Sequence, residues 1–216
     1  MMIILKRILL LLVLFVSAIV IYNYPKLNIL AGYSAKSTAS SVFLAKRSLA
    51  FTDQNDNNFS PVHLAADAVD LEKKTATSSV LGLLTRKAIM REGLGSVLTL
   101  TEADETAPYL VPKRSKTKNH TEPYPYGSAA PKDTVFTNID YERVETSVNS
   151  IFGSDQTRAV VVLYKDHIIS EKYSQGFDAS SRILGWSMTK SILSTVFGVL
   201  AHQKKINIQD KAPVAS

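Results

Sequence analysis

Cysteine is absent from this 216-residue chain, which excludes disulfides, thiol catalysis and cysteine-ligated metal centres. The four histidines are scattered along the sequence without the spacing that zinc ligands share. No motif for a nucleotide, a flavin or another cofactor occurs. We therefore expect no metal and no cofactor, so any chemistry must come from ordinary side chains.

A concentrated basic surface is also lacking, although the formal net charge is +6. The positive charges are spread over the chain apart from one short run at residues 113–118, and no aromatic residues alternate with them. The run lies in a proline-rich stretch and is typical of a solvated loop. Nucleic acid is therefore not an expected partner.

The N-terminus carries the one long apolar run, residues 8–22, which only Ser17 interrupts. Together with residues 1–5 it approaches the roughly 20 residues that span a bilayer. Lys6 and Arg7 precede it, which predicts a cytoplasmic N-terminus and a domain on the periplasmic or extracellular side. A cleaved signal peptide would begin in the same way. Ala31-Gly32 is a later cleavage candidate, but the residues directly after the run, at positions 22–26, are too bulky for a cleavage site. The pattern therefore favours an uncleaved single-pass anchor.

Residues 53–58 are uniformly polar and predict a loop, with too few carboxylates for an EF-hand. Residues 60–71 predict a helix, and residues 95–100 predict a strand. Residues 107–134 hold most of the prolines and predict a long connector.

The last third of the chain has the clearest pattern. Residues 139–152 predict an amphipathic helix that ends at Gly153. Residues 159–164 and 167–173 are rich in β-formers and predict a hairpin turning at Lys165-Asp166. After Ser187, apolar residues recur at the spacing of a buried helix, Ile192, Leu193, Val196, Phe197, Val199 and Leu200.

Ser187 and Lys190 form an S-x-x-K motif at the start of that helix. Residues three apart share a helix face, so the hydroxyl and the ammonium can meet. A partly desolvated lysine could accept the serine proton and create a nucleophile. The alternative is that Ser187 only caps the helix. The same spacing at Ser115 and Lys118 lies in the polar connector and predicts no site.

The order helix, two strands, S-x-x-K helix resembles the opening of serine β-lactamase-related domains, which include penicillin-binding proteins and class C β-lactamases. The residues that carry it are VVLYKDHIISEKYSQGFD and RILGWSMTKSILSTVFGVLAHQKKINIQDKAPV. TRKAIMREGLGSVLTL and PYPYGS resemble more narrowly the branch of 6-aminohexanoate-dimer hydrolases. The resemblance implies an α/β (α+β) fold, part of the β-lactamase/transpeptidase type, with an antiparallel sheet and flanking helices, which the membrane helix predicted from the apolar run precedes.

The resemblance also divides the chain. It implies the N-terminal part of the hydrolase domain at 135–216 and an extension packing on that domain at 27–106, while the apolar run predicts the anchor or signal segment at 1–26 and the prolines predict the connector at 107–134. Ser187 would attack an amide or ester, with Lys190 as its base or electrostatic partner. The Ser187 backbone N–H would form half of the oxyanion hole. The substrate could be a β-lactam, a D-amino-acid peptide, a short-chain ester or an oligoamide, and the branch favours a small linear amide or ester.

Two further motifs of such enzymes are missing. No tyrosine is followed by asparagine at the second position, and neither Lys-Thr-Gly nor His-x-Gly occurs. In the family these motifs follow the nucleophile, so we expect an N-terminal fragment that is inactive or nearly so, and whose C-terminal apolar helix is exposed. The alternative is a non-catalytic, membrane-tethered remnant or binding protein. The oligomeric state is open.

Overall fold

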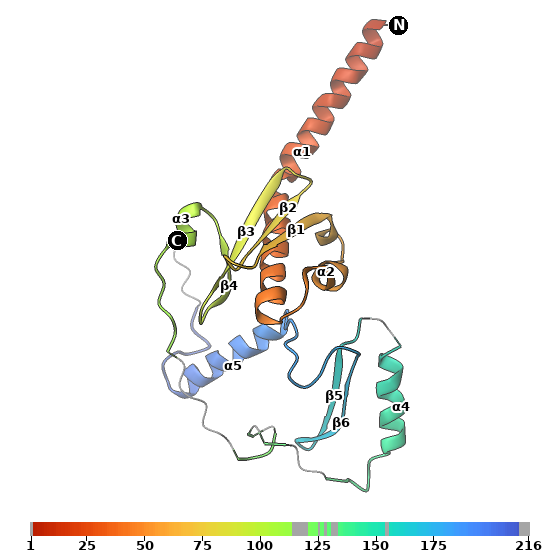
Figure 1. Cartoon of the computed structure of the whole chain (residues 1–216), viewed down its shortest axis with the longest axis vertical. Coiled ribbons are helices and arrows are strands. Elements are labelled where there is room, and N and C mark those ends of the chain that lie inside the picture. Colours follow the sequence, from red (N-terminus) through yellow and green to blue (C-terminus); the bar gives the residue numbers. More distant parts are fainter. Residues whose placement is uncertain are drawn as a thin grey trace. The chain divides into compact units, whose positions relative to one another are not determined.

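The computed structural model describes residues 2–113, 121–124, 126–127, 129–130, 134–153 and 156–211. These residues form two units, one that ends at Ser181 and one that begins at Arg182. The mixed α+β content, the antiparallel sheet and the long apolar N-terminal helix that the sequence predicts are all present (Figure 1).

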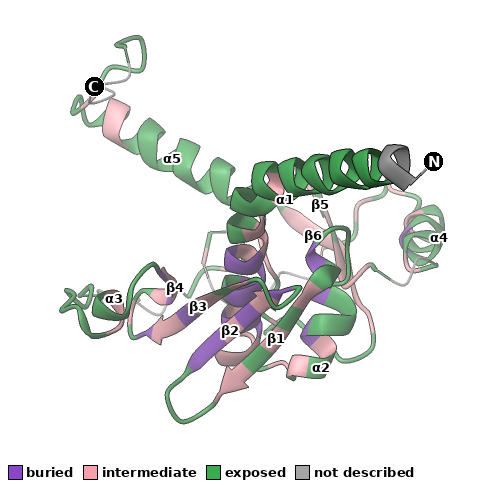
Figure 2. Ribbon diagram, turned by 90° about the horizontal axis from the view of Figure 1, so that it is seen from above, coloured by how far each residue is buried: buried purple, intermediate pink, exposed green. Residues whose placement is uncertain are grey.

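The first unit begins with one long helix, α1 (Met2–Ala39), which continues through Pro25 without interruption. Its leading half exposes apolar side chains, for example Leu11 at 66%. Burial begins only at Ala31, and from there to Ala39 most side chains are buried, with Ala31 and Ala35 fully covered (Figure 2). The change from exposed apolar to buried small residues divides α1 into a free segment and a packed segment.

The packed segment of α1 lies on a four-stranded antiparallel sheet. The strands follow chain order, β1 (Ala65–Asp70), β2 (Thr75–Val80), β3 (Leu84–Arg91) and β4 (Gly95–Thr99). Alternate residues of β2 are fully buried and face the helix, since successive strand side chains point to opposite faces. The predicted strand at residues 95–100 is therefore confirmed as β4.

Small side chains make up the core between α1 and the sheet. Ala35 and Ala39 of the helix meet Ala76 and Ala88, which are paired across β2 and β3. A Cβ added to Gly32 would come within 3.0 Å of a methyl group of Leu98. The helix thus approaches the strands closely, and partly buried side chains close the edges of this core: Phe43, Val69 and Leu98.

A polar cluster joins the same two layers. The Asp67 carboxylate of β1 accepts hydrogen bonds from Ser34 at 2.8 Å and from Thr38 at 2.9 Å, both on α1. The amide of Asn57, which is only 3% exposed, donates to Asp67 at 2.8 Å. These bonds satisfy the hydroxyls of Ser34 and Thr38 and the amide N–H of Asn57, which the small-residue interface buries.

Two predictions for the segment after α1 are wrong. Residues 53–58 are not simply a loop. A helical turn at Thr52–Asp56 leaves Asp56 only 6% exposed and leads into buried Asn57. Residues 60–71 are not a helix. They form a single 3₁₀ turn, Val62–Leu64, and then strand β1. Pairing with β2 satisfies the backbone of β1, and this tertiary contact outweighs the local helix propensity. Two other short elements precede Asp56, a π-helical turn at Ser40–Leu44 and α2 (Leu49–Phe51).

Asp56 is the centre of a buried ion triad. Its carboxylate binds the guanidinium groups of Arg47 at 2.9 Å and Arg158 at 2.5 Å. The Ser41 hydroxyl donates to it at 2.6 Å. Both arginines also lie against the rings of Phe51 and Phe177. The triad joins residues 102 positions apart and fixes the chain before β5 to the turn that follows α1.

The hairpin and the helix before it agree with the sequence predictions, whereas a short helix after β4 was not predicted. A hairpin forms from β5 (Ala159–Tyr164) and β6 (His167–Tyr173), and helix α4 (Tyr141–Ile151) precedes it. The Asp140 side chain caps α4 by accepting from the Arg143 N–H at 3.0 Å. A short helix, α3 (Glu102–Thr106), begins with a capping box.

The second unit is built on α5 (Met188–His202), the helix predicted to follow Ser187. Its large apolar side chains are exposed, as expected, and Ile192 is 65% exposed. Turns follow the helix at residues 203–210. The basic run from residue 114 onward, including Ser115, and the Ala212-Pro213-Val214 part of the family resemblance lie outside the described residues.

We expect Asp56→Ala to reduce the free energy of unfolding by about 3 kcal/mol, because two arginines would keep a buried environment without their counter-ion. Urea denaturation of the full chain in detergent micelles measures it. Asp70→Ala is the matched control, since its partner Lys73 is 80% exposed, and it should cost less than about 1 kcal/mol. Equal losses in the two variants would contradict the structural role of the triad.

Partial burial and the neighbouring Asp67 carboxylate raise the pKa of Asp53 from 3.8 to about 6. A raised pKa means that ionising Asp53 costs more in the folded state, so stability falls as the pH rises from about 4 to about 6. Asp53→Asn should therefore stabilise the protein above about pH 6, by about 1 kcal/mol after allowance for solvent screening at this exposed side chain. Below about pH 4 the gain should vanish. Denaturation at both pH values tests this, with Asp70→Asn as the control, and a gain independent of pH would contradict it.

Candidate active site

The start of α5 brings the two predicted catalytic side chains together. The Lys190 Nζ donates a hydrogen bond to the Ser187 Oγ at 2.9 Å. The contact is local, because the Lys190 N–H also bonds to the Ser187 carbonyl at 3.0 Å and closes the first helical turn. The geometry that the S-x-x-K spacing predicts is therefore present within one turn.

The Ser187 hydroxyl does not cap the helix. Ser187 occupies the N-cap position with φ −67° and ψ −9°, and its side chain makes no capping hydrogen bond. Its backbone N–H has no acceptor within the described part of the chain. The hydroxyl is thus committed to Lys190, and the N–H at the helix start is available to a developing negative charge.

The residue before the serine has an unusual backbone. Trp186 has φ +44°, a left-handed value that bulky residues rarely adopt. Its carbonyl accepts hydrogen bonds from the Thr189 hydroxyl at 2.8 Å and from the Thr189 N–H at 3.3 Å, which hold the turn in place. Strained residues of this kind often occur at functional sites, where surrounding bonds maintain them.

The environment of the pair differs from the expectation in one respect. Ser187 and Lys190 are both exposed. None of the residues that the structure describes covers Lys190 enough to give the partial desolvation that the sequence predicts. The reason is that α5 is largely uncovered. In this state the lysine is a hydrogen-bond donor, and covering it would be needed to favour the neutral amine that accepts a proton.

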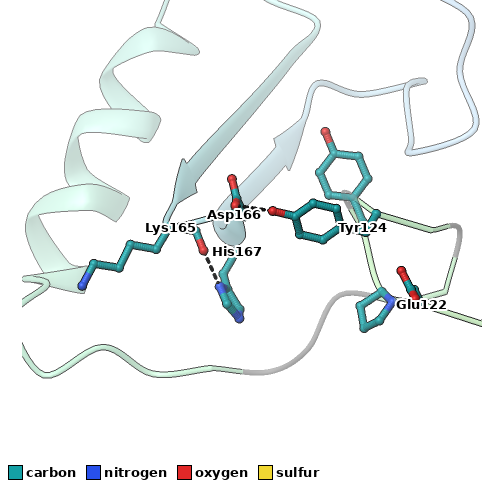
Figure 3. Close-up of a pocket in the computed structure, with 7 residues that line it drawn as sticks. Glu122, Tyr124, Lys165, Asp166 and His167 are labelled. Atoms are coloured by element: carbon teal, nitrogen blue, oxygen red, sulfur yellow. Dashed lines mark hydrogen bonds between the residues drawn. The ribbon is translucent and has the colours of Figure 1, made fainter.

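Apart from this pair, a hollow of about 560 Å³ lies at the turn of the β5–β6 hairpin, where the sequence predicted no site (Figure 3). Lys165 and Asp166 both have positive φ values there. The Tyr126 hydroxyl donates to the Asp166 carboxylate at 2.6 Å, and this acceptor raises the pKa of Tyr126. His167 is held by the Lys165 carbonyl at 2.8 Å. Glu122, Pro123 and Tyr124 complete the lining. The sequence signals for it were PYPYGS and the predicted hairpin turn at Lys165-Asp166, both within the quoted resemblance.

These groups form no recognisable catalytic set. The Tyr126 hydroxyl is already bonded to Asp166, and no nucleophile with an adjacent base lines the hollow. Nor do three His, Cys, Asp or Glu side chains converge to hold a metal anywhere in the described ranges. Ser187 and Lys190 therefore remain the candidate active site.

Comparisons with known proteins add no relative. No family model matches the chain, and neither a curated protein nor a solved structure is similar to it. The resemblance to serine β-lactamase-related enzymes therefore depends on the quoted residues alone.

Proposed function

We propose that Ser187 is the nucleophile of a membrane-anchored serine hydrolase and that this chain is the N-terminal part of that enzyme. The observation that carries the proposal is the 2.9 Å contact between the Lys190 Nζ and the Ser187 Oγ. The substrate class that follows from the resemblance is a small linear amide or ester. The acyl group of the substrate would be transferred to Ser187 and then to water.

Each group in the proposed reaction has one role. The neutral Lys190 amine accepts the Ser187 proton while the Oγ attacks the carbonyl carbon. The Ser187 N–H donates to the oxyanion that forms. The lysine then returns its proton to the leaving amine or alcohol, which leaves an acyl-enzyme. Water attacks this ester, releases the acid and restores the serine.

Three features of the described residues support this assignment. The serine hydroxyl is not used as a helix cap, the preceding Trp186 holds a strained backbone, and the helix N-terminus favours negative charge. The proposal also requires a second proton-transfer group and a second oxyanion donor, because the sequence contains no Tyr-x-Asn, Lys-Thr-Gly or His-x-Gly motif. Its tests therefore use the native protein in membranes.

The anchor in this proposal is the free segment of α1. This helix is long and apolar enough to cross a membrane, and the apolar window within it is not buried by the rest of the chain. A single pass with the catalytic residues on the periplasmic or extracellular side follows from Lys6 and Arg7 preceding the run. A cleaved signal sequence would share this composition, and the mass of the native protein distinguishes the two.

The second candidate function is that of a non-catalytic, membrane-tethered binding protein. It is favoured by the exposure of Ser187 and Lys190 and by the absence of the second and third motifs. In that case the S-x-x-K turn would be a relic without reactivity. Covalent labelling separates this candidate from the hydrolase.

We expect Ser187→Ala to abolish covalent labelling of the native protein by a fluorophosphonate, a loss on the order of a thousand-fold or more, because the attacking oxygen is removed. Lys190→Ala should greatly slow labelling by removing the base. Gel fluorescence of labelled membranes measures both rates. A fluorescent penicillin, used in parallel, separates peptidoglycan-directed activity from general esterase chemistry.

Two serine variants serve as matched controls. Ser191→Ala changes a hydroxyl on the same exposed helix, and Ser115→Ala changes the other serine with the S-x-x-K spacing. Both should label like the unmodified protein. Intact labelling of Ser187→Ala would refute the proposal, and an unreactive parent protein would favour the binding protein.

We expect Leu12→Arg to release a large fraction of the protein from membranes, because an arginine at the centre of a spanning helix costs about 2.5–3.5 kcal/mol. Alkaline carbonate extraction followed by immunoblotting measures the fraction retained. Leu110→Arg is the control, since Leu110 is 92% exposed and lies outside α1. Retention of both variants would argue against a spanning anchor.

A further inference from the structure

The turn between β2 and β3 exposes leucines where a turn in water would carry polar residues. Leu81 is 66% exposed and Leu83 is 55% exposed. The six residues from Val80 to Thr85 include no charged side chain. This turn is therefore an apolar tip on the sheet.

The backbone conformation of the turn makes Leu81 more unusual. The Leu83 N–H bonds to the Val80 carbonyl at 3.0 Å, and the two central residues, Leu81 and Gly82, have φ values of +53° and +66°. Positive φ at both central residues is what a type I′ turn requires, and asparagine, aspartate or glycine is preferred at such positions. A leucine at the first position is unfavourable in conformation wherever it lies, and it is unfavourable in solvation as well when its surroundings are water.

The opposite end of the sheet has the usual composition. The β1–β2 turn contains Leu71, but Glu72, Lys73 and Lys74 follow directly. The Asp70 carboxylate accepts from the Lys73 N–H at 2.9 Å, as in ordinary water-exposed turns. Leucines are exposed at this end too, Leu71 at 71% and Leu94 at 47%, but charged residues flank them, whereas the β2–β3 turn contains none.

The end of the sheet that carries the β2–β3 turn lies where the free segment of α1 leaves the sheet (Figure 1). The Tyr24 hydroxyl of α1 lies 3.5 Å from the Leu83 carbonyl oxygen. Tyr24 is only two residues, or about 3 Å of helix rise, beyond the end of the apolar run at Tyr22. The leucine tip is therefore level with the boundary of the apolar segment.

The residues of α1 at this boundary have the composition of a membrane interface. Tyr22 is 73% exposed, and the Lys26 ammonium lies 4.4 Å from the centre of its ring. Lys26 also donates to the Asn23 side chain at 2.8 Å. Tyrosine and lysine at the end of an apolar helix are typical of the headgroup region.

From this we propose that the β2–β3 turn inserts Leu81 and Leu83 into the interfacial layer of the bilayer that α1 spans. The inference rests on the proposed anchoring, because the continuity of the leucines with the apolar run identifies the occupant as lipid. The turn would be a second contact with the membrane and would fix the tilt and rotation of the sheet domain. A helix alone would leave that domain free to rotate about its axis.

The absence of native cysteine permits a direct test. Leu83→Cys, Leu71→Cys and Leu12→Cys are prepared in the full chain and labelled with an environment-sensitive fluorophore. Each is reconstituted in vesicles of equal parts phosphatidylcholine and phosphatidylglycerol. Nitroxide lipids that carry the quencher near the headgroup or deep in the acyl chains report the depth of each label. Circular dichroism checks that each variant folds.

We expect the Leu83→Cys label to emit at shorter wavelength and to be quenched by headgroup-level nitroxide, whereas the Leu71→Cys label stays in water. Quenching of the Leu12→Cys label by deep nitroxide reports the anchor. If Leu12→Cys is quenched and Leu83→Cys behaves like Leu71→Cys, the inference is overturned and the anchor stands. If Leu12→Cys is not quenched, the anchor fails and the inference with it. Equal shallow quenching of Leu71→Cys and Leu83→Cys would overturn a contact specific to this turn.

Discussion

A single helix, α1, has an exposed apolar segment and a segment that packs on the sheet. The position of the sheet in the first unit depends on where along the helix the first segment gives way to the second. Before Tyr22 its side chains are large, apolar and exposed, whereas beyond Lys26 the buried ones are alanine, serine and threonine. The large side chains suit lipid, and the small ones let the helix approach the strands closely. Because the helix is continuous through Pro25, the sheet is joined to the apolar segment without a linker.

Polar contacts complete an interface that small side chains could not stabilise alone. Alanine and glycine bury little apolar area, so packing between α1 and the sheet contributes less than a leucine-rich core would. Asp67 joins the two layers through Ser34, Thr38 and Asn57. Asp56 and its two arginines join the residues that follow α1 to the start of the β5–β6 hairpin in the same way, through polar contacts. A buried ion triad adds geometric specificity more surely than net stability, since its desolvation cost is large.

The Ser187–Lys190 pair shows the difference between geometry and reactivity. One turn of α5 places the two atoms 2.9 Å apart, with no contribution from other elements. Reactivity requires more than this distance, because a lysine must be in its neutral form to accept a proton and a single N–H donor forms only half of an oxyanion hole. The chemistry of this pair therefore depends on what covers α5, whereas its geometry does not.

The sequence by itself determined what local physics controls. The apolar run of α1, helix α4, the β5–β6 hairpin, helix α5 and the meeting of Ser187 with Lys190 all follow from short-range periodicity and spacing. Only the tertiary structure decided that residues 65–70 form a strand, that Asp56 is buried between two arginines, and that the leucine turn lies beside Tyr24. Each of these depends on partners that lie up to 102 residues away. Local propensity does not contain such contacts, because it reports how a segment behaves before its partners are in place.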